Sequence, residues 1–250
     1  MAFFEYQSKK IYYEVIGNGE PLIMLHGDTA SSKMFEMLIP MYQQYFEVIL
    51  IDFLGNGRSD RIERFPANLW VTQADQIIAL IEHLQLNEVN LLGTSGGAWV
   101  AINTALKRPD LVNKVIADSF DGRTLHNNFI NELTQEREFA KHDAFAKQFY
   151  EWCQGNDWEN VVNLNTQALV ECAKKQIPLF CRPLETLKTP ILLIGSLEDD
   201  MCRKDIQAEY EAIKKMVFDA SIYLFKTGKH PAIASNAEKF FDIVKSYIYS

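Results

Sequence analysis

The sequence predicts an α/β protein built on a parallel sheet with helices on both faces. Continuous apolar runs occur at 21–25, 48–51 and 190–194, as is typical of strands that are buried on both faces. A further strand is expected at 89–92. Between them lie segments whose apolar residues recur at helical spacing. Alternation of strand and helix along a chain indicates a parallel sheet. The 250 residues allow one large domain of this kind or two small ones.

The first half of the chain begins with two short strands, at 2–6 and 10–16. The Gly17-Asn18-Gly19 turn that follows them favours an antiparallel hairpin at the edge of the sheet. The remaining elements expected there are a strand at 21–25, a helix at 34–45, a strand at 48–51, a turn-rich loop at 53–60, a helix at 69–84, a strand at 89–92, a helix that stops before Pro109 and a strand at 114–117.

The character of the chain changes between residues 121 and 189. Helical periodicity dominates there and the buried-strand runs disappear, which predicts a helical insertion over the sheet. The sheet pattern then resumes with a strand at 190–194, a helix at 204–216, a strand at 221–225 and a last helix at 236–249. We therefore assign residues 1–120 and 190–250 to the core and 121–189 to a helical cap or lid.

Residues 90–99, NLLGTSGGAW, read as the end of a strand, a sharp turn with Ser95 at its tip and the start of a helix. Gly93, Ser95 and Gly97 fit the G-x-S-x-G nucleophile elbow. Such a turn strains the tip residue and crowds its neighbours, so the positions two before and two after it must lack side chains. The hydroxyl then lies beside a helix N-terminus with unpaired N–H groups. The N–H of Gly96 is the first candidate donor to an oxyanion.

Other reactive residues also follow the carboxyl ends of predicted strands: His26-Gly27, the acidic run at 198–200 and His230. That edge is where open α/β sheets place their ligand sites. A serine hydroxyl needs a base, and the base needs a partner that fixes its tautomer. The chain order of nucleophile, acid and histidine is the one expected for this architecture.

His230 is the candidate base, because its loop follows the last strand and could fold back over the sheet edge. Only one of Glu198, Asp199 and Asp200 can point at it. We favour Asp199 as the orienting acid, since apolar residues follow two and three positions later, and Glu198 is the main competitor. A cation site in this loop is not favoured without a further carboxylate cluster.

The turn at His26-Gly27-Asp28 supplies a second candidate oxyanion donor, the backbone N–H of Asp28. That role leaves the Asp28 side chain free to face solvent or substrate. We expect His26 to hold its own loop in place. For Asp52, together with the turn at 55–59, we likewise expect a structural role.

Composition and charge limit the kinds of molecule that this protein is expected to bind. The net charge of −8 argues against nucleic acid and against an anionic membrane surface. The four cysteines show no C-x-x-C spacing, the N-terminus does not read as a secretory signal, and no apolar run is long enough to cross a membrane. We predict a cytoplasmic protein with reduced thiols, a small-molecule substrate, and no cofactor or metal. A homodimer is left open.

Taken together, these motifs resemble those of the α/β-hydrolase fold superfamily, over almost the whole chain. The resemblance is carried by His26-Gly27, D-x-x-G-x-G-x-S at 52–59, G-T-S-G-G at 93–97, the acidic loop after Gly195 and G-K-H at 228–230. It implies a mostly parallel eight-stranded sheet, a helical cap, a pocket between cap and core, and a Ser-Asp-His triad made of Ser95, Asp199 and His230.

The predicted function is a serine hydrolase that cleaves a small, largely uncharged ester or related acyl compound through an acyl-enzyme. Serine at the elbow speaks against the dehalogenases and epoxide hydrolases of the superfamily, which carry Asp there. Thr94 and Gly96 differ from the G-G-S-W-G typical of proline iminopeptidases and disfavour that subgroup. The alternatives are hydrolysis of a C–C bond, lactone or amide, acyl transfer, or a non-catalytic binding protein on the same fold.

Overall fold

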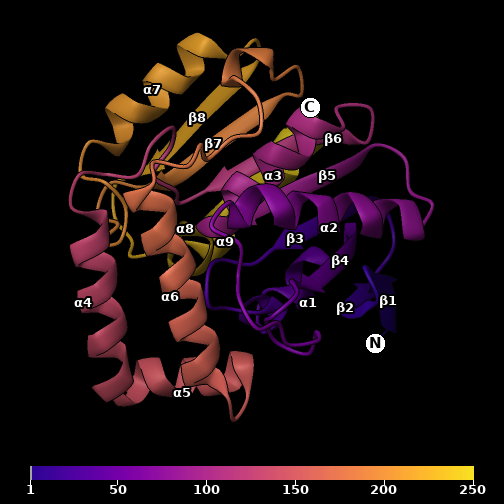
Figure 1. Cartoon of the computed structure of the whole chain (residues 1–250). Helices are drawn as coiled ribbons and strands as arrows, with labels where there is room; N and C mark the ends of the chain where they lie inside the picture. Colours follow the sequence, from indigo (N-terminus) through magenta and orange to yellow (C-terminus); the bar gives the residue numbers. More distant parts are fainter. Residues whose placement is uncertain (1) are drawn as a thin grey trace.

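The computed structural model describes residues 2–250 and contains one eight-stranded sheet of order β1-β2-β4-β3-β5-β6-β7-β8 (Figure 1). Strands β1 and β2 form an antiparallel hairpin, and β2 pairs antiparallel with β4. All later pairings are parallel. The strands are β1 (Ala2–Tyr6), β2 (Lys9–Ile16), β3 (Glu20–Leu25), β4 (Phe46–Asp52), β5 (Val89–Thr94), β6 (Val112–Asp118), β7 (Ile191–Ser196) and β8 (Ala220–Phe225). The predicted fold class is confirmed.

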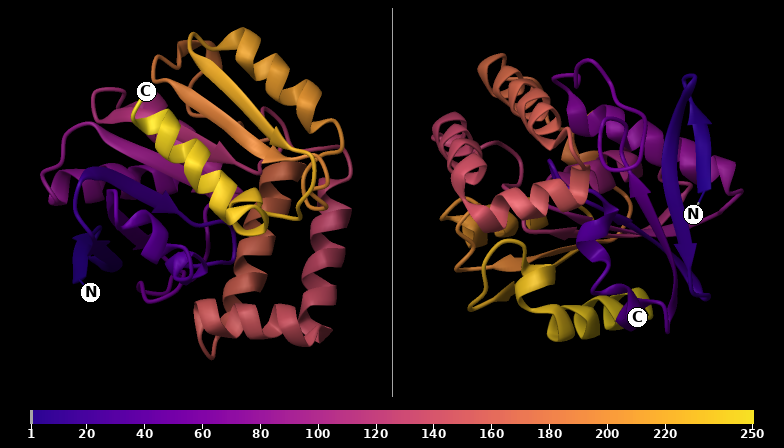
Figure 2. Two further views of the ribbon diagram at one scale, coloured as in Figure 1. Left: turned by 180° about the vertical axis from the view of Figure 1, so that it is seen from behind. Right: turned by 90° about the horizontal axis from the view of Figure 1, so that it is seen from below.

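Helices cover both faces of this sheet (Figure 2). Side chains alternate along each strand, so Ile23 and Leu25 of β3 pack in one core cluster while Leu22 and Met24 pack in the other. The first cluster includes residues of α2 (Leu69–His83), α3 (Gly96–Lys107) and α7 (Ile206–Met216). The second includes residues of α1 (Ile39–Tyr42) and α9 (Ala237–Ile248).

Three longer helices lie between β6 and β7: α4 (Phe129–His142), α5 (Ala144–Gln154) and α6 (Trp158–Lys174). We call them the α4–α6 segment. Helices α4 and α6 run side by side, and α5 crosses between their ends (Figures 1 and 2). Gln154, at the end of α5, is buried against the core and donates to the carbonyl of Ala30 at 2.7 Å. Its Oε1 accepts from the Gly57 N–H at 2.7 Å. The segment is therefore fastened to the loop that follows His26.

One predicted helix differs from the structure. The expected helix at 34–45 is instead a 3₁₀ turn, η1 (Ser32–Phe35), followed by the short α1. Pro40 explains the break, because it lacks an N–H and its ring clashes with a preceding helical turn, so it is tolerated only at the start of a helix. The last helix, α9, agrees with the predicted one to within one residue at each end, and a separate short helix, α8 (Ala232–Ser235), precedes it.

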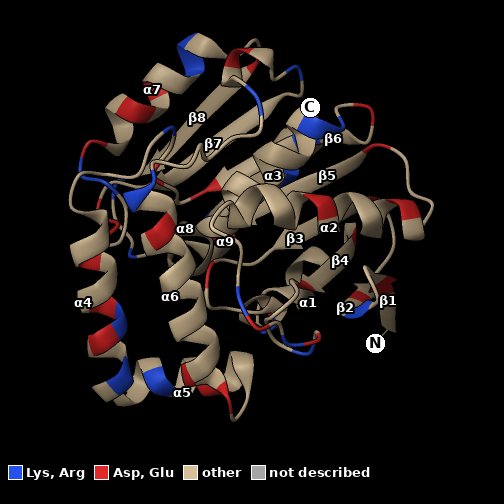
Figure 3. Cartoon of the chain, in the orientation of Figure 1, with Lys and Arg blue, Asp and Glu red and all other residues tan. Residues whose placement is uncertain are grey.

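Acidic and basic residues are interspersed along α4, α5 and α7 (Figure 3). Within residues 2–250, none of the helices combines the length and apolar character that crossing a membrane would need.

Candidate active site

Ser95 lies at the tip of the turn between β5 and α3, with φ 55° and ψ −123°. A non-glycine residue with positive φ is uncommon and is held there by its surroundings. A Cβ on Gly93 would overlap the carbonyl of Gly97, and a Cβ on Gly97 would overlap the carbonyl of Leu25. Both glycines of the motif are therefore sterically required, as the sequence predicted.

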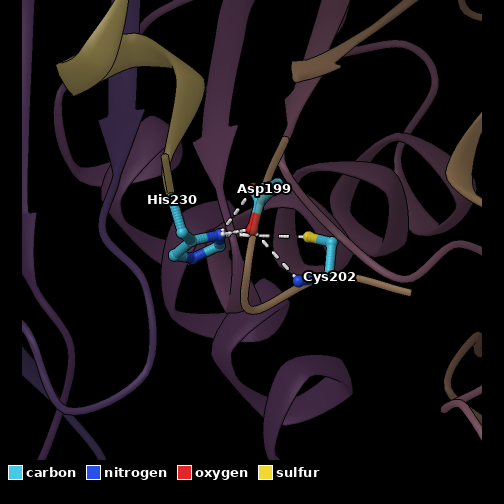
Figure 4. Close-up of side chains that lie close together, drawn as sticks. All are labelled: Asp199, Cys202 and His230. Atoms are coloured by element: carbon cyan, nitrogen blue, oxygen red, sulfur yellow. Dashed lines mark hydrogen bonds and ion pairs between the residues drawn. The ribbon is translucent and has the colours of Figure 1, made fainter. Parts of the chain in front are cut away.

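His230 and Asp199 lie in direct contact (Figure 4). The His230 Nδ1–H donates to the carboxylate of Asp199, with distances of 2.9 Å to Oδ2 and 3.2 Å to Oδ1. Asp199 Oδ1 also accepts from the backbone N–H groups of Met201 and Cys202, at 2.9 and 3.0 Å. These bonds fix the carboxylate in place. Since Nδ1 carries the proton, Nε2 is the nitrogen left to act as a base.

The other two acidic candidates point elsewhere. Asp200 is exposed and pairs with the ammonium group of Lys229 at 3.4 Å. Glu198 is exposed, and its backbone N–H donates to Ser196 Oγ at 3.4 Å. The structure therefore selects Asp199 from the acidic run as the partner of His230.

Asp199 and His230 each stabilise the charged form of the other. Burial raises the pKa of Asp199, but the hydrogen bond and charge of His230 and the two backbone N–H groups outweigh it and hold the pKa below its ordinary value. Burial lowers the pKa of His230, but Asp199, with smaller contributions from Asp118 and Glu136, raises it above its ordinary value. An imidazolium formed during a reaction would be stabilised here.

Asp118, at the end of β6, links the turns that carry Ser95 and His230. Its buried carboxylate accepts from the Thr94 hydroxyl on one side and from the Ile233 N–H, at 3.3 Å, on the other. Its backbone carbonyl accepts from the Ser95 N–H at 2.8 Å. Burial raises the pKa of Asp118 to about 6, despite those donors and the charge of His230. The two turns are thus fixed relative to one another through a third strand.

The Ser95 hydroxyl makes no hydrogen bond to another group within residues 2–250, His230 included. Hydrogen bonds between a nucleophile and its base are often long until substrate binds. The structure therefore brings the histidine and the acid together and leaves the third contact of the predicted triad unmade.

The other side of Ser95 is lined by the turn after β3. A Cβ on Gly27 would stand 3.1 Å from Ser95 Cβ, so the chain passes closely over the nucleophile. The Asp28 N–H donates to no backbone acceptor within residues 2–250, and the N–H of Gly96 lies at the first position of α3, where helices leave it unpaired. Both predicted oxyanion donors are thus available.

The half-buried Asp28 side chain lies against the site. A Cβ on Gly96 would stand 2.6 Å from Asp28 Oδ2, so this carboxylate lies directly against the residue after the nucleophile. The Trp70 indole N–H donates to both of its oxygens, at 3.2 and 3.3 Å. Burial raises the pKa of Asp28 to about 6, although Arg137, Trp70 and Asn165 act in the opposite direction.

His26 and Asp52 have the structural roles that the sequence indicated. The Phe53 N–H donates to His26 Nε2 at 3.2 Å, and His26 Nδ1–H donates to the carbonyl of Gly27 at 2.8 Å. The carboxylate of Asp52 is buried and accepts from the backbone N–H groups of Ser32 and Arg58, each at 2.8 Å. Both residues hold loops beside the site.

One group of side chains has the composition of a metal site. The ligand atoms of Asp199, Cys202 and His230 all lie within 4.8 Å of one another, and Cys202 Sγ is 3.9 Å from His230 Nδ1 (Figure 4). A cation there would compete with Asp199 for Nδ1. In this structure Asp199 and His230 form a hydrogen-bonded pair, and the buried thiol of Cys202 packs beside them.

Sequence reasoning missed the polar residues that act on Asp28, which are Trp70 of α2, Arg137 of α4 and Asn165 of α6, and it missed Tyr150 of α5, which accepts from Arg137. They lie in helices, and no spacing or motif in the sequence sets them apart. A buried arginine is recognisable only once the helices are packed.

The pocket expected between core and cap stays a prediction. Two surface hollows of residues 2–250 lie elsewhere, one against Phe180 and Met216 and the other against β8 and α9. Ser95 and His230 line neither of them.

Comparison with known proteins agrees with this geometry. A family model described as alpha/beta hydrolase fold matches residues 20–175. The match covers more than half of the chain, so this protein belongs to the α/β hydrolase fold family. It is a member of a hydrolase family whose characterised relatives act on several kinds of bond.

Among the relatives in sequence, a proline iminopeptidase of Clostridium botulinum is 34% identical over 161 residues, which cover 59% of this chain and 52% of the relative. A 2-(acetamidomethylene)succinate hydrolase of Mesorhizobium japonicum is 37% identical over 105 residues, 42% of this chain and 37% of the relative. The chain spans about half of the length of these relatives, or less. Whether the departure from G-G-S-W-G excludes peptidase activity therefore stays a prediction.

Solved structures match over nearly the whole chain. A meta-cleavage product hydrolase of Pseudomonas fluorescens superposes with a TM-score of 0.80 at 19% identity, covering 97% of this chain and 95% of that one. An esterase of Exiguobacterium antarcticum superposes with a TM-score of 0.78 at 22% identity, covering 99% of both. At these identities the likeness establishes the fold, and the bond that is cleaved has to be argued from the site.

Proposed function

We propose that this protein is a serine hydrolase that cleaves an ester or related acyl bond through an acyl-enzyme. The observation that carries the proposal is the bond between His230 Nδ1 and the Asp199 carboxylate, at the same sheet edge as a serine held at φ 55°. A histidine oriented by a buried acid is the arrangement that activates a serine nucleophile.

In the proposed reaction, His230 Nε2 takes the proton of the Ser95 hydroxyl as Oγ attacks the carbonyl carbon. The oxyanion that forms accepts hydrogen bonds from the Gly96 and Asp28 N–H groups. As the intermediate collapses, the bond to the leaving alcohol breaks and His230 returns the proton to its oxygen. Water, deprotonated by His230, then attacks the acyl-enzyme and releases the acid and the free Ser95 hydroxyl.

We propose the α4–α6 segment as the cap of this site. Gln154 fastens it to the loop that carries Asp28, and Glu136 of α4 lies close enough to raise the pKa of His230. Substrate specificity would then depend on side chains from these helices. The sequence predicts a largely uncharged substrate, whereas the buried Arg137 of α4 favours an anionic one.

A fluorophosphonate probe tests the nucleophile. We expect one adduct on the peptide that contains Ser95, and hydrolysis of short 4-nitrophenyl esters that is lost in Ser95→Ala. Absence of an adduct on folded protein would favour a binding protein on the same fold. An adduct on a different residue would overturn the assignment of Ser95.

The same residues suit a second bond type. Relatives in structure include a meta-cleavage product hydrolase, and the same acid–histidine pair could serve hydrolysis of a C–C bond, a lactone or an amide. A panel of 4-nitrophenyl esters, lactones, anilides and diketones separates these activities by relative kcat/KM. We expect the esters to be the fastest.

A further inference from the structure

The guanidinium of Arg137, on α4, is buried, and one of its edges makes no hydrogen bond within residues 2–250. The residue is 8% exposed. The two hydrogen bonds of its guanidinium both use Nη1, which donates to Tyr150 Oη at 2.5 Å and to Glu136 Oε1 at 3.2 Å. Its Nε is buried and has no acceptor within residues 2–250. The Nε–Nη2 edge therefore presents its donors to no carboxylate or carbonyl of the described chain.

A second unpartnered group lies nearby. Asn165 of α6 is 1% exposed, and its Oδ1 has no donor within residues 2–250. Arg137 donates to Tyr150 of α5, and Gln154 of the same helix donates to the carbonyls of Thr29 and Ala30, which directly follow Asp28. Arg137 and Asn165 also each lower the pKa of the Asp28 carboxyl. Asp28 in turn lies against Gly96, the residue after the nucleophile. The two unpartnered groups thus belong to the wall of the proposed active site.

Leaving such groups unpaired is costly. A buried donor without a partner loses its hydration and gains nothing in exchange, and a buried charge costs more than a neutral group. The fold therefore keeps Arg137 at the expense of stability. Asp28 does not relieve it, because within residues 2–250 the ion pair of Arg137 is made with Glu136, at 3.2 Å, and not with Asp28. The free edge of a guanidinium matches a carboxylate, whose two oxygens accept its parallel N–H donors.

We propose that Arg137 binds a carboxylate of the substrate and makes this protein selective for anionic acyl compounds. The proposal rests on the proposed serine hydrolase function and names its substrate class. Asn165 Oδ1 accepts from a donor on the same substrate. Arg137 is in this view a specificity-determining residue that lies outside the acid–histidine pair.

Two matched pairs of esters test the proposal. The first is mono-4-nitrophenyl glutarate against 4-nitrophenyl valerate, which differ by a carboxylate in place of a terminal methyl group. The second is 4-acetoxybenzoate against its methyl ester, which moves the carboxylate to the leaving alcohol. We expect wild type to prefer the anionic member of at least one pair in kcat/KM. No preference in either pair would overturn the proposal.

Arg137→Gln should lose about 10- to 100-fold in kcat/KM on the preferred anionic ester, mostly through KM. Its activity on the neutral partner should stay within about threefold of wild type. Arg182→Gln, at an exposed arginine, is the matched control and should change neither. An equal loss on both esters would mean that Arg137 serves the fold through Tyr150, and would contradict the proposal.

Arg137→Lys covers the case in which the glutamine variant does not fold. Lysine keeps the charge but lacks the paired donors, so we expect a smaller but still selective loss on the anionic ester. Calorimetry with glutarate on Ser95→Ala and on Ser95→Ala/Arg137→Lys measures the carboxylate site without turnover. Binding that is weakened by the second substitution, together with wild-type protein that fails to label at Ser95, would uphold the carboxylate site and reject the hydrolase. Equal binding by both variants would reject the carboxylate site.

Discussion

The carboxylate of Asp28 lies against Gly96, so that a Cβ on Gly96 would stand 2.6 Å from Asp28 Oδ2. Gly96 supplies one of the two N–H groups that we propose for the oxyanion. A negative charge so close to that donor opposes the charge that develops on the substrate oxygen. Because burial raises the pKa of Asp28 to about 6, this opposition depends on pH.

The first prediction concerns Asp28→Asn, which removes the charge and keeps the shape. Below pH 6 the wild-type carboxyl is neutral and the two proteins should turn over similarly. Above pH 6 the wild type is ionised, and the variant should gain in kcat relative to it, by roughly tenfold at pH 8. Steady-state kinetics on a neutral ester from pH 5 to 8 measures this ratio. A ratio that is constant across the range would show that the oxyanion does not sense Asp28.

The second prediction separates the chemistry of Ser95 from its backbone conformation. Ser95→Ala and Ser95→Gly should both lose at least about 10³-fold in kcat. Glycine tolerates φ 55° without a steric penalty, whereas alanine does not. The free energy of unfolding, measured in urea, should therefore be about 1 kcal/mol larger for the glycine variant than for the alanine variant. A less stable glycine variant would contradict strain at this position.

The third prediction tests which acid orients His230. Asp199→Asn should lose about 10⁴-fold in kcat, because the amide cannot hold the imidazole in the required tautomer or stabilise its charge. Asp200→Asn is the matched control, since Asp200 is adjacent, exposed and paired with Lys229. We expect it to change kcat less than about twofold. Comparable losses in both variants would argue against a specific Asp199–His230 pair.

The fourth prediction follows from the buried carboxyl of Asp118, whose pKa burial raises from 3.8 to about 6. Between these two values the folded state holds a proton that the unfolded state has lost. The contribution of this group to the free energy of unfolding is therefore fully present below about pH 4. It falls by about 3 kcal/mol as the pH rises through about 6.

Asp118→Asn removes this titration. Relative to wild type, the variant should become more stable as the pH is raised from 4 to 7.5, whatever constant offset the substitution brings. Urea unfolding of both proteins at several pH values measures the difference. Parallel stability curves would mean that the Asp118 carboxyl has the same pKa in both states.

The strands, the elbow and the order of the reactive residues could be read from the sequence because they depend on neighbours along the chain. Strands that are buried on both faces are recognised in the sequence as apolar runs. The glycines around Ser95 are required by the turn itself. The helix expected at 34–45 failed for a reason that is also local, since Pro40 interrupts it. The prediction of a helix there followed several apolar residues at helical spacing and gave too little importance to the single proline.

The sequence could only favour Asp199 over Glu198 and Asp200, because consecutive residues in a loop differ mainly in the direction of their side chains. The structure shows that Asp199 contacts His230 and that Asp200 pairs with Lys229. The inward turn of Asp28 and the burial of Arg137 left no sequence signal at all. The sequence by itself determined the fold family, and it predicted the class of chemistry from a strained turn and an ordered set of side chains. Tertiary structure decided which charges line the site, because a charge is buried or paired only by residues that are distant along the chain.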